Sequence, residues 1–475
     1  MALHTQMARR YTQEDALDPY RLLSFVVPAG IARLTVRYRY ADPADPALGG
    51  KASGTVIDLG LFDPRGHDYL DAKGFRGWSG SAREEVTIAP QGATPGYLPG
   101  PIQPGTWHVL LGLYRIGPSG CEVRVEIEMV EGAACDVAPP AYRPQGTLCE
   151  ERRWYRGDLH CHTHHSDATA GVEALIAAAQ AQGLDFLAVT EHNTVSHLPD
   201  LMRHAPPDLL LIPGIEITTY RGHANLWGVR GWHEFRATND RAMRQIRERA
   251  RARGHLFSVN HPKPGGPPWA FNDTFAPDAV EGWQAPWFLG NSLSLAFWEG
   301  LLRQGQRPTL VGGSDKHQGA FDGHLSAYEV GTPTTWVHAA GLSESGILDG
   351  IRAGRVYVSR DPSGPRLSLT ARAAGHEASM GEVLEVRREE EITFHCQVCD
   401  APQSYLLRIV GRRGEMARVR IAGSAWDHTW TERATEDGYT RVEVIEPPDA
   451  PLEGDPAALM AHALSNPIYL RIADR

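Results

Sequence analysis

The chain has little lysine, and its charge balance is acidic rather than basic. Its lysines are Lys51, Lys73, Lys263 and Lys316, and the formal net charge is -10 over 475 residues. A chain of this charge lacks the broad positive surface that recognises nucleic acid, so DNA or RNA is not an expected partner. The balance still permits a local cationic pocket around a small anionic substrate.

Cysteine is also scarce, with six residues scattered through the chain. This distribution argues against a disulfide framework. Cys396 and Cys399 form a CxxC pair, but Ile392, Phe394, Cys396 and Val398 alternate with polar residues. Alternation with a period of two is typical of a strand. We therefore interpret this pair as core residues rather than as a zinc or redox site.

Long apolar runs are absent. No segment is long enough to cross a bilayer, and no apolar stretch of signal-peptide length follows Arg9 and Arg10. We therefore expect no membrane association and a cytoplasmic location. The composition, with 42% hydrophobic and 22% charged residues, is that of an ordinary globular protein, and the length suggests several domains.

Three segments differ in their patterning. Residues 1–150 contain alternating runs separated by turn-rich pieces, which predicts a β-sandwich-like domain. Residues 151–362 alternate short apolar runs with amphipathic stretches such as Asn239–Arg253, which is typical of an α/β domain. β character returns in residues 363–475. We predict an α/β barrel between two β-rich domains, and we expect the N-terminal domain to be a lid or buttress on the barrel.

The segment Gly157–Asp167 concentrates potential metal ligands. His160 and His162 lie one residue apart, and Asp167 follows five residues later. If a strand ends near Leu159, both imidazoles point the same way, because side chains alternate along a strand. Cys161 then points away and is left out of the site. Two adjacent imidazoles with a carboxylate can form the floor of a hydrolytic metal site.

Further histidines and acids fall near the ends of the predicted strands at 186–190, 209–212, 224–229, 255–259 and 309–311. The carboxyl ends of parallel barrel strands meet on one face. Nitrogen and oxygen ligands without thiolate suit Mn, Fe or Zn. Because one ion does not need so many ligands, we expect two or three divalent ions. The predicted ligands are His160, His162, Asp167, His192, Glu216, His223, His261, Asp315 and His317.

These motifs resemble those of the PHP (polymerase and histidinol phosphatase) superfamily over roughly residues 154–362. The resemblance implies an α/β fold with a distorted (β/α)7 barrel and a di- or trinuclear metal centre that mostly cleaves phosphate esters. Where the family usually has aspartate, this chain has Glu191, and the extra methylene is expected to affect how His192 is oriented. The implied ligand sets are His160, His162, Glu216 and Asp315 for a first metal, Glu216, His223 and His261 for a second, and Asp167, His192 and His317 for a third.

The flanking segments add a second likeness. Gly77–Gly80 and Gly105–Trp107 are similar to the branch of this superfamily that includes carbaryl (carbamate) hydrolases. A carbamate or carboxylester hydrolase at the same metal centre is therefore an alternative to a phosphoesterase.

We predict a phosphoesterase in which hydroxide bridging the metals attacks a small phosphomonoester or phosphodiester. A 5'-3' exonuclease-type phosphodiesterase and a non-catalytic binding protein are two further hypotheses. Nine ligands speak against the binding protein, because a structural site is usually closed by about four. The predicted catalytic residues are Glu216, Asp315, His261 and Lys316, and the predicted substrate-binding residues are Arg221, Lys263, Lys316 and Arg360.

Overall fold

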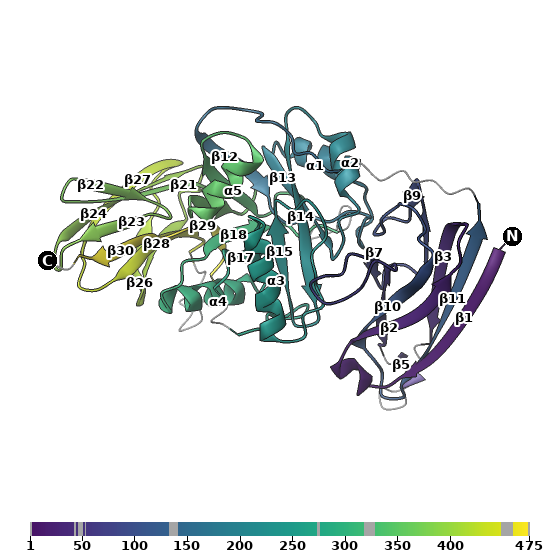
Figure 1. The fold of residues 1–475 in the computed structure, drawn as a ribbon. Helices are drawn as coiled ribbons and strands as arrows, with labels where there is room; N and C mark the ends of the chain where they lie inside the picture. Colours follow the sequence, from purple (N-terminus) through teal and green to yellow (C-terminus); the bar gives the residue numbers. More distant parts are fainter. Residues whose placement is uncertain are drawn as a thin grey trace.

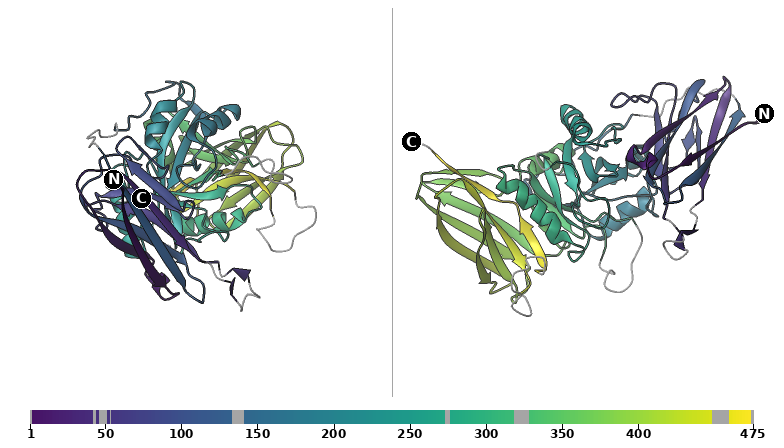
Figure 2. Two further views of the ribbon diagram at one scale, coloured as in Figure 1. Left: turned by 90° about the vertical axis from the view of Figure 1, so that its right-hand side faces the viewer. Right: turned by 90° about the horizontal axis from the view of Figure 1, so that it is seen from below.

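The structure is a computed structural model that describes residues 2–41, 44–45, 51–52, 54–132, 141–272, 276–317, 328–447 and 459–473. A β-rich N-terminal part, an α/β centre and a β-rich C-terminal part follow one another along an elongated molecule (Figure 1). Strands β1 (Ala2–Tyr11) and β30 (Ile468–Ile472) lie toward opposite ends of the molecule in Figure 1 and in the right-hand view of Figure 2.

The N-terminal part contains two antiparallel sheets that share one apolar core. On β3, Leu34, Val36 and Tyr38 are buried, and they belong to the same core as Leu59 of β6 and Val109 of β10. This alternation confirms the predicted β character. A short helical turn, η1 (Asp15–Leu17), and the pair β4 (Ala44–Asp45) and β5 (Lys51–Ala52) lie outside the two sheets. The sheets run β1 (Ala2–Tyr11), β11 (Cys121–Glu131), β3 (Ile31–Tyr40), β8 (Glu85–Ala89), β9 (Gly92–Ala93), and β2 (Tyr20–Val27), β10 (Gly105–Arg115), β6 (Val56–Phe62), β7 (Phe75–Gly80).

The central part is built on one mixed sheet. β12, β13 and β14 run parallel, β15 is antiparallel to both β14 and β16, and β16, β17 and β18 again run parallel. The order across the sheet is β18 (Thr309–Gly313), β17 (Ala279–Gln284), β16 (Leu256–Asn260), β15 (Gly222–Trp227), β14 (Leu210–Thr219), β13 (Phe186–His192), β12 (Arg153–Asp158), β19 (Thr334–Ala339) and β20 (Val356–Ser359).

The helices begin and end at residues that the sequence marks. α3 begins after Asn239, whose side chain accepts a hydrogen bond from the Ala242 amide, and Gly254 follows its end with φ +82°. Gly183, with φ +66°, follows α1 in the same way. The amphipathic stretch predicted at Asn239–Arg253 is therefore confirmed as a helix. The α-helices are α1 (Val172–Ala181), α2 (Leu198–His204), α3 (Asp240–Ala252), α4 (Asn291–Arg303) and α5 (Glu344–Arg352).

The predicted (β/α)7 barrel is not confirmed, although the α/β character is. The described residues contain five α-helices, which is too few for seven strand–helix units. β14 and β15 are joined directly by a turn at Tyr220–Arg221, so no crossover helix separates them and they run antiparallel. The prediction also ends the β14 strand too early, because Glu216 lies inside β14 rather than beyond it.

The sheet ends meet where the first sequence motif lies. Beyond β12 and β18 the chain pairs again, since Cys161 forms a parallel bridge with Lys316. The Asp315 amide donates to the His160 carbonyl at 2.7 Å, and the His162 amide donates to the Lys316 carbonyl at 3.2 Å. These backbone bonds place the His160–Cys161–His162 segment beside the Asp315–Lys316–His317 segment.

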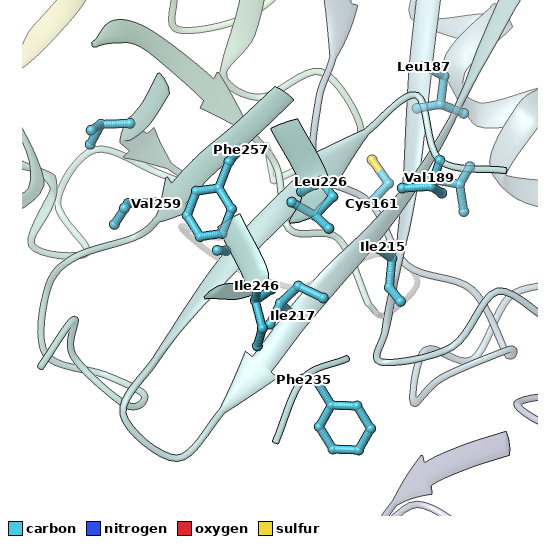
Figure 3. Packing of buried hydrophobic residues seen from close by; sticks show 14 of the residues in the cluster. Cys161, Leu187, Val189, Ile215, Ile217, Leu226, Phe235, Ile246, Phe257 and Val259 are labelled. Carbon is cyan, nitrogen blue, oxygen red and sulfur yellow. The ribbon is translucent and has the colours of Figure 1, made fainter. Parts of the chain in front are cut away.

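Alternation on the strands separates core from site. Ile215 and Ile217 of β14 pack with Leu226 of β15 in the apolar cluster shown in Figure 3, whereas Glu216 faces the other side. Cys161 lies in the same cluster, and its Sγ is 3.4 Å from the Ser314 hydroxyl. The prediction that Cys161 points away from His160 and His162 is therefore confirmed.

The C-terminal part extends the central sheet and adds a second one. β20 pairs with β29, so one sheet runs from the centre into this part. Cys396 lies in a buried core with Phe394, which confirms the prediction for this cysteine, whereas Cys399 at the end of the same strand is half-buried. No helix in the described residues is long and apolar enough to cross a membrane. The added strands are β29 (Ala461–Ser465), β28 (Gly438–Ile445), β25 (Leu406–Gly411), β26 (Gly414–Arg420), β30 (Ile468–Ile472), β23 (Val383–Val386), and the sheet β22 (His376–Ser379), β21 (Arg366–Ala373), β24 (Glu391–Cys399), β27 (Ala425–Arg433).

Candidate metal centre

Glu216 lies at the middle of a cluster of histidines. Its carboxylate is fully buried, and its two oxygens face different ring nitrogens. Asn260 donates a hydrogen bond from Nδ2 to Oε1 at 2.8 Å, which fixes the carboxylate plane. Oε1 lies 3.3 Å from His160 Nε2, 3.4 Å from His223 Nδ1 and 3.4 Å from His261 Nε2, and Oε2 lies 2.7 Å from His192 Nδ1 and 3.7 Å from His162 Nε2.

Strand register brings these residues together. His192, the last residue of β13, is the partner of Glu216 on β14. On the other side of β14, Thr218 is the partner of His223 on β15, and His223 is in turn the partner of Asn260 on β16. His261 follows Asn260 directly. The pairing register of β13, β14, β15 and β16 therefore brings His192, Glu216, His223 and His261 next to one another.

A second group forms around Asp167. Its Oδ1 lies 3.4 Å from His192 Nε2 and 3.3 Å from His317 Nε2, and these two ring nitrogens lie 3.1 Å apart. The His162 ring stacks on the His317 ring with centroids 4.1 Å apart. Three imidazoles and one carboxylate thus surround one small volume.

Asp315 connects the two groups. Its Oδ1 lies 3.3 Å from His160 Nε2 and 3.0 Å from His162 Nε2. These three atoms are buried, yet none of them has a hydrogen-bond partner of acceptable geometry. Buried polar atoms without partners are rare, because each carries a desolvation penalty of roughly 1–3 kcal/mol. A shared cation would satisfy all three at once, so the residues fit a metal.

Three small groups of ligand atoms correspond to the expected ligand sets, and a fourth contains Glu281, which belongs to none of these sets. Within each group the donor atoms lie within 4.8 Å of one another. The set expected for the third metal is extended by His162, and Asp315 approaches the first set through its Oδ1 atom. The groups are His160, His162 and Glu216; Glu216, His223 and His261; His162, Asp167, His192 and His317; and His160, His261 and Glu281.

The carboxylates of the cluster are held in their charged form. Burial alone would raise the pKa of Glu216, but His160, His223 and His192 lower it well below its ordinary value. Burial likewise opposes the charge on Asp315, and His160 and His317 lower its pKa well below the usual range. The cluster therefore keeps buried anions of the kind that bind cations.

Glu281 on β17 is a member of the cluster that the sequence did not reveal. Its Oε1 lies 2.8 Å from His160 Nδ1, and its Oε2 accepts a hydrogen bond from the His261 amide at 3.0 Å. Because a carboxylate oxygen only accepts, His160 Nδ1 carries the proton and Nε2 is left as the ligand atom. His317 is oriented similarly, since its Nδ1 lies 2.9 Å from the Asp315 carbonyl.

Glu191 points toward the first motif rather than toward the metal ligands. Its Oε1 accepts hydrogen bonds from the Thr163 amide and hydroxyl at 2.9 and 2.6 Å, and its Oε2 accepts from the Ser166 hydroxyl at 2.5 Å. Burial raises the pKa of Glu191 to about 7. The residue thus holds the loop that carries Asp167, whereas His192 is oriented by Thr218, whose hydroxyl lies 2.6 Å from Nδ1.

Two of the expected ligands have strained backbones. His261 has φ +27° and Asp315 has φ +53°, which is the left-handed region that residues with a side chain seldom adopt. Strain of this kind is often found at functional sites, where surrounding contacts hold it in place. For Asp315 the contact is the 2.7 Å bond from its amide to the His160 carbonyl.

A cavity of about 630 Å³ opens over the cluster and is lined by His192, His223, His261, Asp315 and His317. Among the predicted substrate-binding cations, Lys263 lines this cavity. Its ammonium donates to the Gln284 carbonyl at 3.1 Å and to Asn291 Oδ1 at 2.8 Å, and burial lowers its pKa to about 8.

The other three predicted cations lie elsewhere. The Lys316 ammonium donates to the Tyr328 carbonyl and is 3.4 Å from the Glu329 carboxylate, which argues against its predicted catalytic role. Arg221 donates to the Ala270 carbonyl at 2.6 Å. Arg360 lines a separate cavity of about 490 Å³ that also contains the side chains of Trp283, Trp287 and His462.

Comparison with known proteins finds a family match for part of the region that carries the cluster. Residues 158–251 match the family model of the PHP domain, which confirms the predicted resemblance to the PHP superfamily for this region. The match includes His160, His192, Glu216 and His223, and it ends before His261.

Two solved structures show weaker similarity. A two-domain protein from Bacteroides vulgatus, described as containing a predicted PHP-like metal-dependent phosphoesterase, is 15% identical, with 69% of this chain and 100% of that chain covered and a TM-score of 0.36. The CARDB domain of a Pyrococcus furiosus protein is 11% identical, with 23% and 98% covered and a TM-score of 0.15. No curated protein matches the chain.

Proposed function

We propose that this chain is a metal-dependent hydrolase that cleaves a small phosphomonoester or phosphodiester at the cluster around Glu216. The observation that carries the proposal is the convergence of buried potential metal-ligand atoms that have no hydrogen-bond partner. These are above all His160 Nε2, His162 Nε2 and Asp315 Oδ1. The PHP-domain match over residues 158–251 supports the same class of site.

The proposed ligands are those that the donor groups bring together. His160, His162, Glu216 and Asp315 would hold one divalent ion, and Glu216 would be shared with a second ion held by His223 and His261. Asp167, His192 and His317 would hold a third. Such ions supply a water of lowered pKa and neutralise charge on the ester oxygens.

The chain itself orients the reactants. Glu281 and the Asp315 carbonyl fix the rings of His160 and His317, so that their Nε2 atoms face the cluster. Lys263 lies in the wall of the cavity above, where its ammonium can hold a non-reacting phosphate oxygen. Hydrolysis adds water across the P–O bond and releases an alcohol and a phosphate.

The size of the cavity favours a small substrate. A volume of about 630 Å³ lies within the usual range for small-molecule sites, which is roughly 300–1,000 Å³. The net charge of -10 provides no long positive surface along which a polynucleotide could lie. We therefore propose a small phosphoester rather than a nucleic acid as the substrate.

The experiment compares the chelator-stripped protein with the same protein reloaded with Mn, Fe or Zn. We expect two or three ions per chain by elemental analysis, and we expect hydrolysis of nitrophenyl phosphate or bis-nitrophenyl phosphate to return only on reloading. A reloaded protein that binds at most one ion, or that binds several and hydrolyses neither ester, would contradict the proposal.

A further inference from the structure

The N-terminal part of the chain forms one wall of a second cavity at the metal-ligand cluster. This cavity has a volume of about 340 Å³, and Asp167, His192 and His223 lie on the cluster side of it. Asp58, Trp78 and Tyr114 line it from the N-terminal sheets, and Tyr220 lines it from the turn between β14 and β15. A substrate whose phosphate lies at the cluster can therefore extend one arm into this space.

The contacts in this wall are direct and closely fitted. The Tyr220 hydroxyl donates to Asp58 Oδ2 at 2.6 Å across 162 positions of sequence. The Tyr220 and Tyr114 ring centroids lie 5.1 Å apart, and Tyr220 also stacks on Tyr20 at 5.5 Å. Gly112 of β10 makes room for this arrangement, because a Cβ at that position would lie 2.0 Å from the Tyr220 hydroxyl.

Outside the proposed metal ligands, the charged residues that line the two cavities are opposite in sign. Lys263 lines the larger cavity, whereas Asp58 lines the smaller one beside the phenol rings of Tyr114 and Tyr220. Burial raises the pKa of Asp58 to about 6, so the group is an anion at neutral and alkaline pH. A carboxylate flanked by aromatic rings attracts an organic cation and repels a second anionic group.

We propose that this cavity binds the alcohol part of the substrate and selects phosphoesters whose alcohol is an aromatic ring bearing a cationic amine. This inference rests on the proposed phosphoesterase function and adds its substrate class. Asp58 is the residue that sets the preference, and Tyr114 and Tyr220 supply the aromatic faces.

The first experiment uses the metal-loaded full chain near pH 8 and two aryl phosphates of matched size. One carries an aminoethyl group on the ring and the other a carboxyethyl group. We expect the wild type to show a kcat/KM for the aminoethyl ester at least about tenfold above that for the carboxyethyl ester, and Asp58→Asn to reduce this ratio about tenfold.

Asp71→Asn is the matched control. It makes the same charge change in the N-terminal part, but Asp71 is exposed beside Lys73 and does not line this cavity. We expect Asp71→Asn to keep the wild-type ratio. Equal rates for the two esters in the wild type, or the same ratio in Asp58→Asn and the wild type, would overturn the inference.

A second variant covers the case in which Asp58→Asn does not fold. Tyr114 is 43% exposed, so Tyr114→Ala removes an aromatic face without opening the core. We expect it to lower kcat/KM for the aminoethyl aryl ester at least tenfold while changing that for aminoethyl phosphate, which has no ring, by less than threefold. Equal loss on both substrates would contradict an aromatic binding role.

A binding measurement separates this inference from the proposed function. If the metal-loaded protein hydrolyses no phosphoester, the proposed function fails, and calorimetry with tyramine and with hydroxyphenylpropionate then tests the cavity alone. Tighter binding of tyramine that weakens in Asp58→Asn would support the cavity assignment without catalysis. Equal affinity for the two phenols in the wild type would overturn it.

Discussion

Glu281 holds His160 from the side opposite the ligand cluster, with Oε1 2.8 Å from Nδ1, while His160 Nε2 lies 3.3 Å from both Glu216 and Asp315. This pair shows that a carboxylate outside the proposed ligand sets orients one of the proposed metal ligands. A carboxylate that fixes the tautomer of a ligating histidine also increases its basicity.

We therefore expect Glu281→Gln to weaken metal binding about 10- to 100-fold, as loss of such a partner typically does. The measurement is metal content after dialysis against graded chelator concentrations. Glu446→Gln is the control, because Glu446 makes the same 2.8 Å contact to His462 in the C-terminal part. Equal metal retention by the two variants would show that Glu281 does not support the centre.

Glu216→Gln removes the charge at the centre of the cluster. A neutral amide is a poor bridge between two cations, and without the bridge the cations repel each other over a short distance. We expect the loss of at least one ion per chain and a fall in kcat of more than about 100-fold, which exceeds the loss of activity typical for a residue that only orients a metal ligand. Full metal content with near-normal turnover would show that Glu216 does not bridge.

Most of the cluster can be predicted from the sequence because histidines and acidic residues are unusual within or beside apolar strand segments. Histidines and acids stand within or shortly after apolar runs, as His192 does after 186–190 and Asp315 after 309–311. The predicted strand at 209–212 stops short of the hairpin turn at Tyr220–Arg221, so the prediction places Glu216 beyond a short strand instead of inside β14. The sequence signal that would have corrected this prediction is the apolar pattern that continues on both sides of the turn, in β14 and β15.

Other features carry no comparable signal in the sequence. Glu281 stands alone in an ordinary strand pattern, and only its burial marks it. Lys316 could have been excluded by the alternation that excludes Cys161, because its neighbours Asp315 and His317 both face the cluster. The contact of Asp58 with Tyr220 joins two parts of the chain that no local pattern relates.

The tight junction between the N-terminal part and the centre predicts a steric effect at Gly112. A Cβ there would lie 2.0 Å from the Tyr220 hydroxyl and 2.8 Å from the Trp78 ring. We expect Gly112→Ala to lower the free energy of unfolding by about 1–3 kcal/mol. Thermal unfolding measures this, with Gly92→Ala as control because nothing lies within 4 Å of a Cβ at Gly92. Equal midpoints in the two variants would contradict the close contact.

The raised pKa of Asp58 predicts a pH-dependent cost to stability. Burial raises its pKa from 3.8 to about 6, so the folded chain holds this proton more tightly than the unfolded chain. The stabilisation is complete below about pH 4 and is lost as pH rises through 6.

Asp58→Asn cannot lose this proton, so its unfolding free energy should rise relative to the wild type between about pH 4 and pH 7, by no more than about 3 kcal/mol. Unfolding midpoints across this range test the prediction in the presence of chelator, which removes metal binding as a variable. Asp71→Asn, which replaces an exposed carboxyl in the same part of the chain, is the control, and the pH-dependent rise in Asp58→Asn should exceed any change in this control. A rise in Asp58→Asn no larger than the change in the control would mean that the carboxyl titrates normally.

The choice between phosphorus and carbon as the reacting atom predicts a rank order of substrates. A multinuclear centre neutralises charge on several oxygens, and a phosphoryl group presents those oxygens where a carbonyl presents one. Lys263 in the cavity wall favours a substrate that remains anionic throughout.

We expect kcat/KM to be higher for nitrophenyl phosphate or bis-nitrophenyl phosphate than for nitrophenyl acetate or a nitrophenyl carbamate, all measured on one metal-replete preparation. Lys263→Met should reduce the phosphate rates at least about tenfold, because a charge-assisted hydrogen bond is lost, and should leave the acetate rate nearly unchanged. A carbamate preference that disappears in Glu216→Gln would mean that the same centre attacks carbonyl carbon. In that case the phosphoester assignment fails while the metal centre stands.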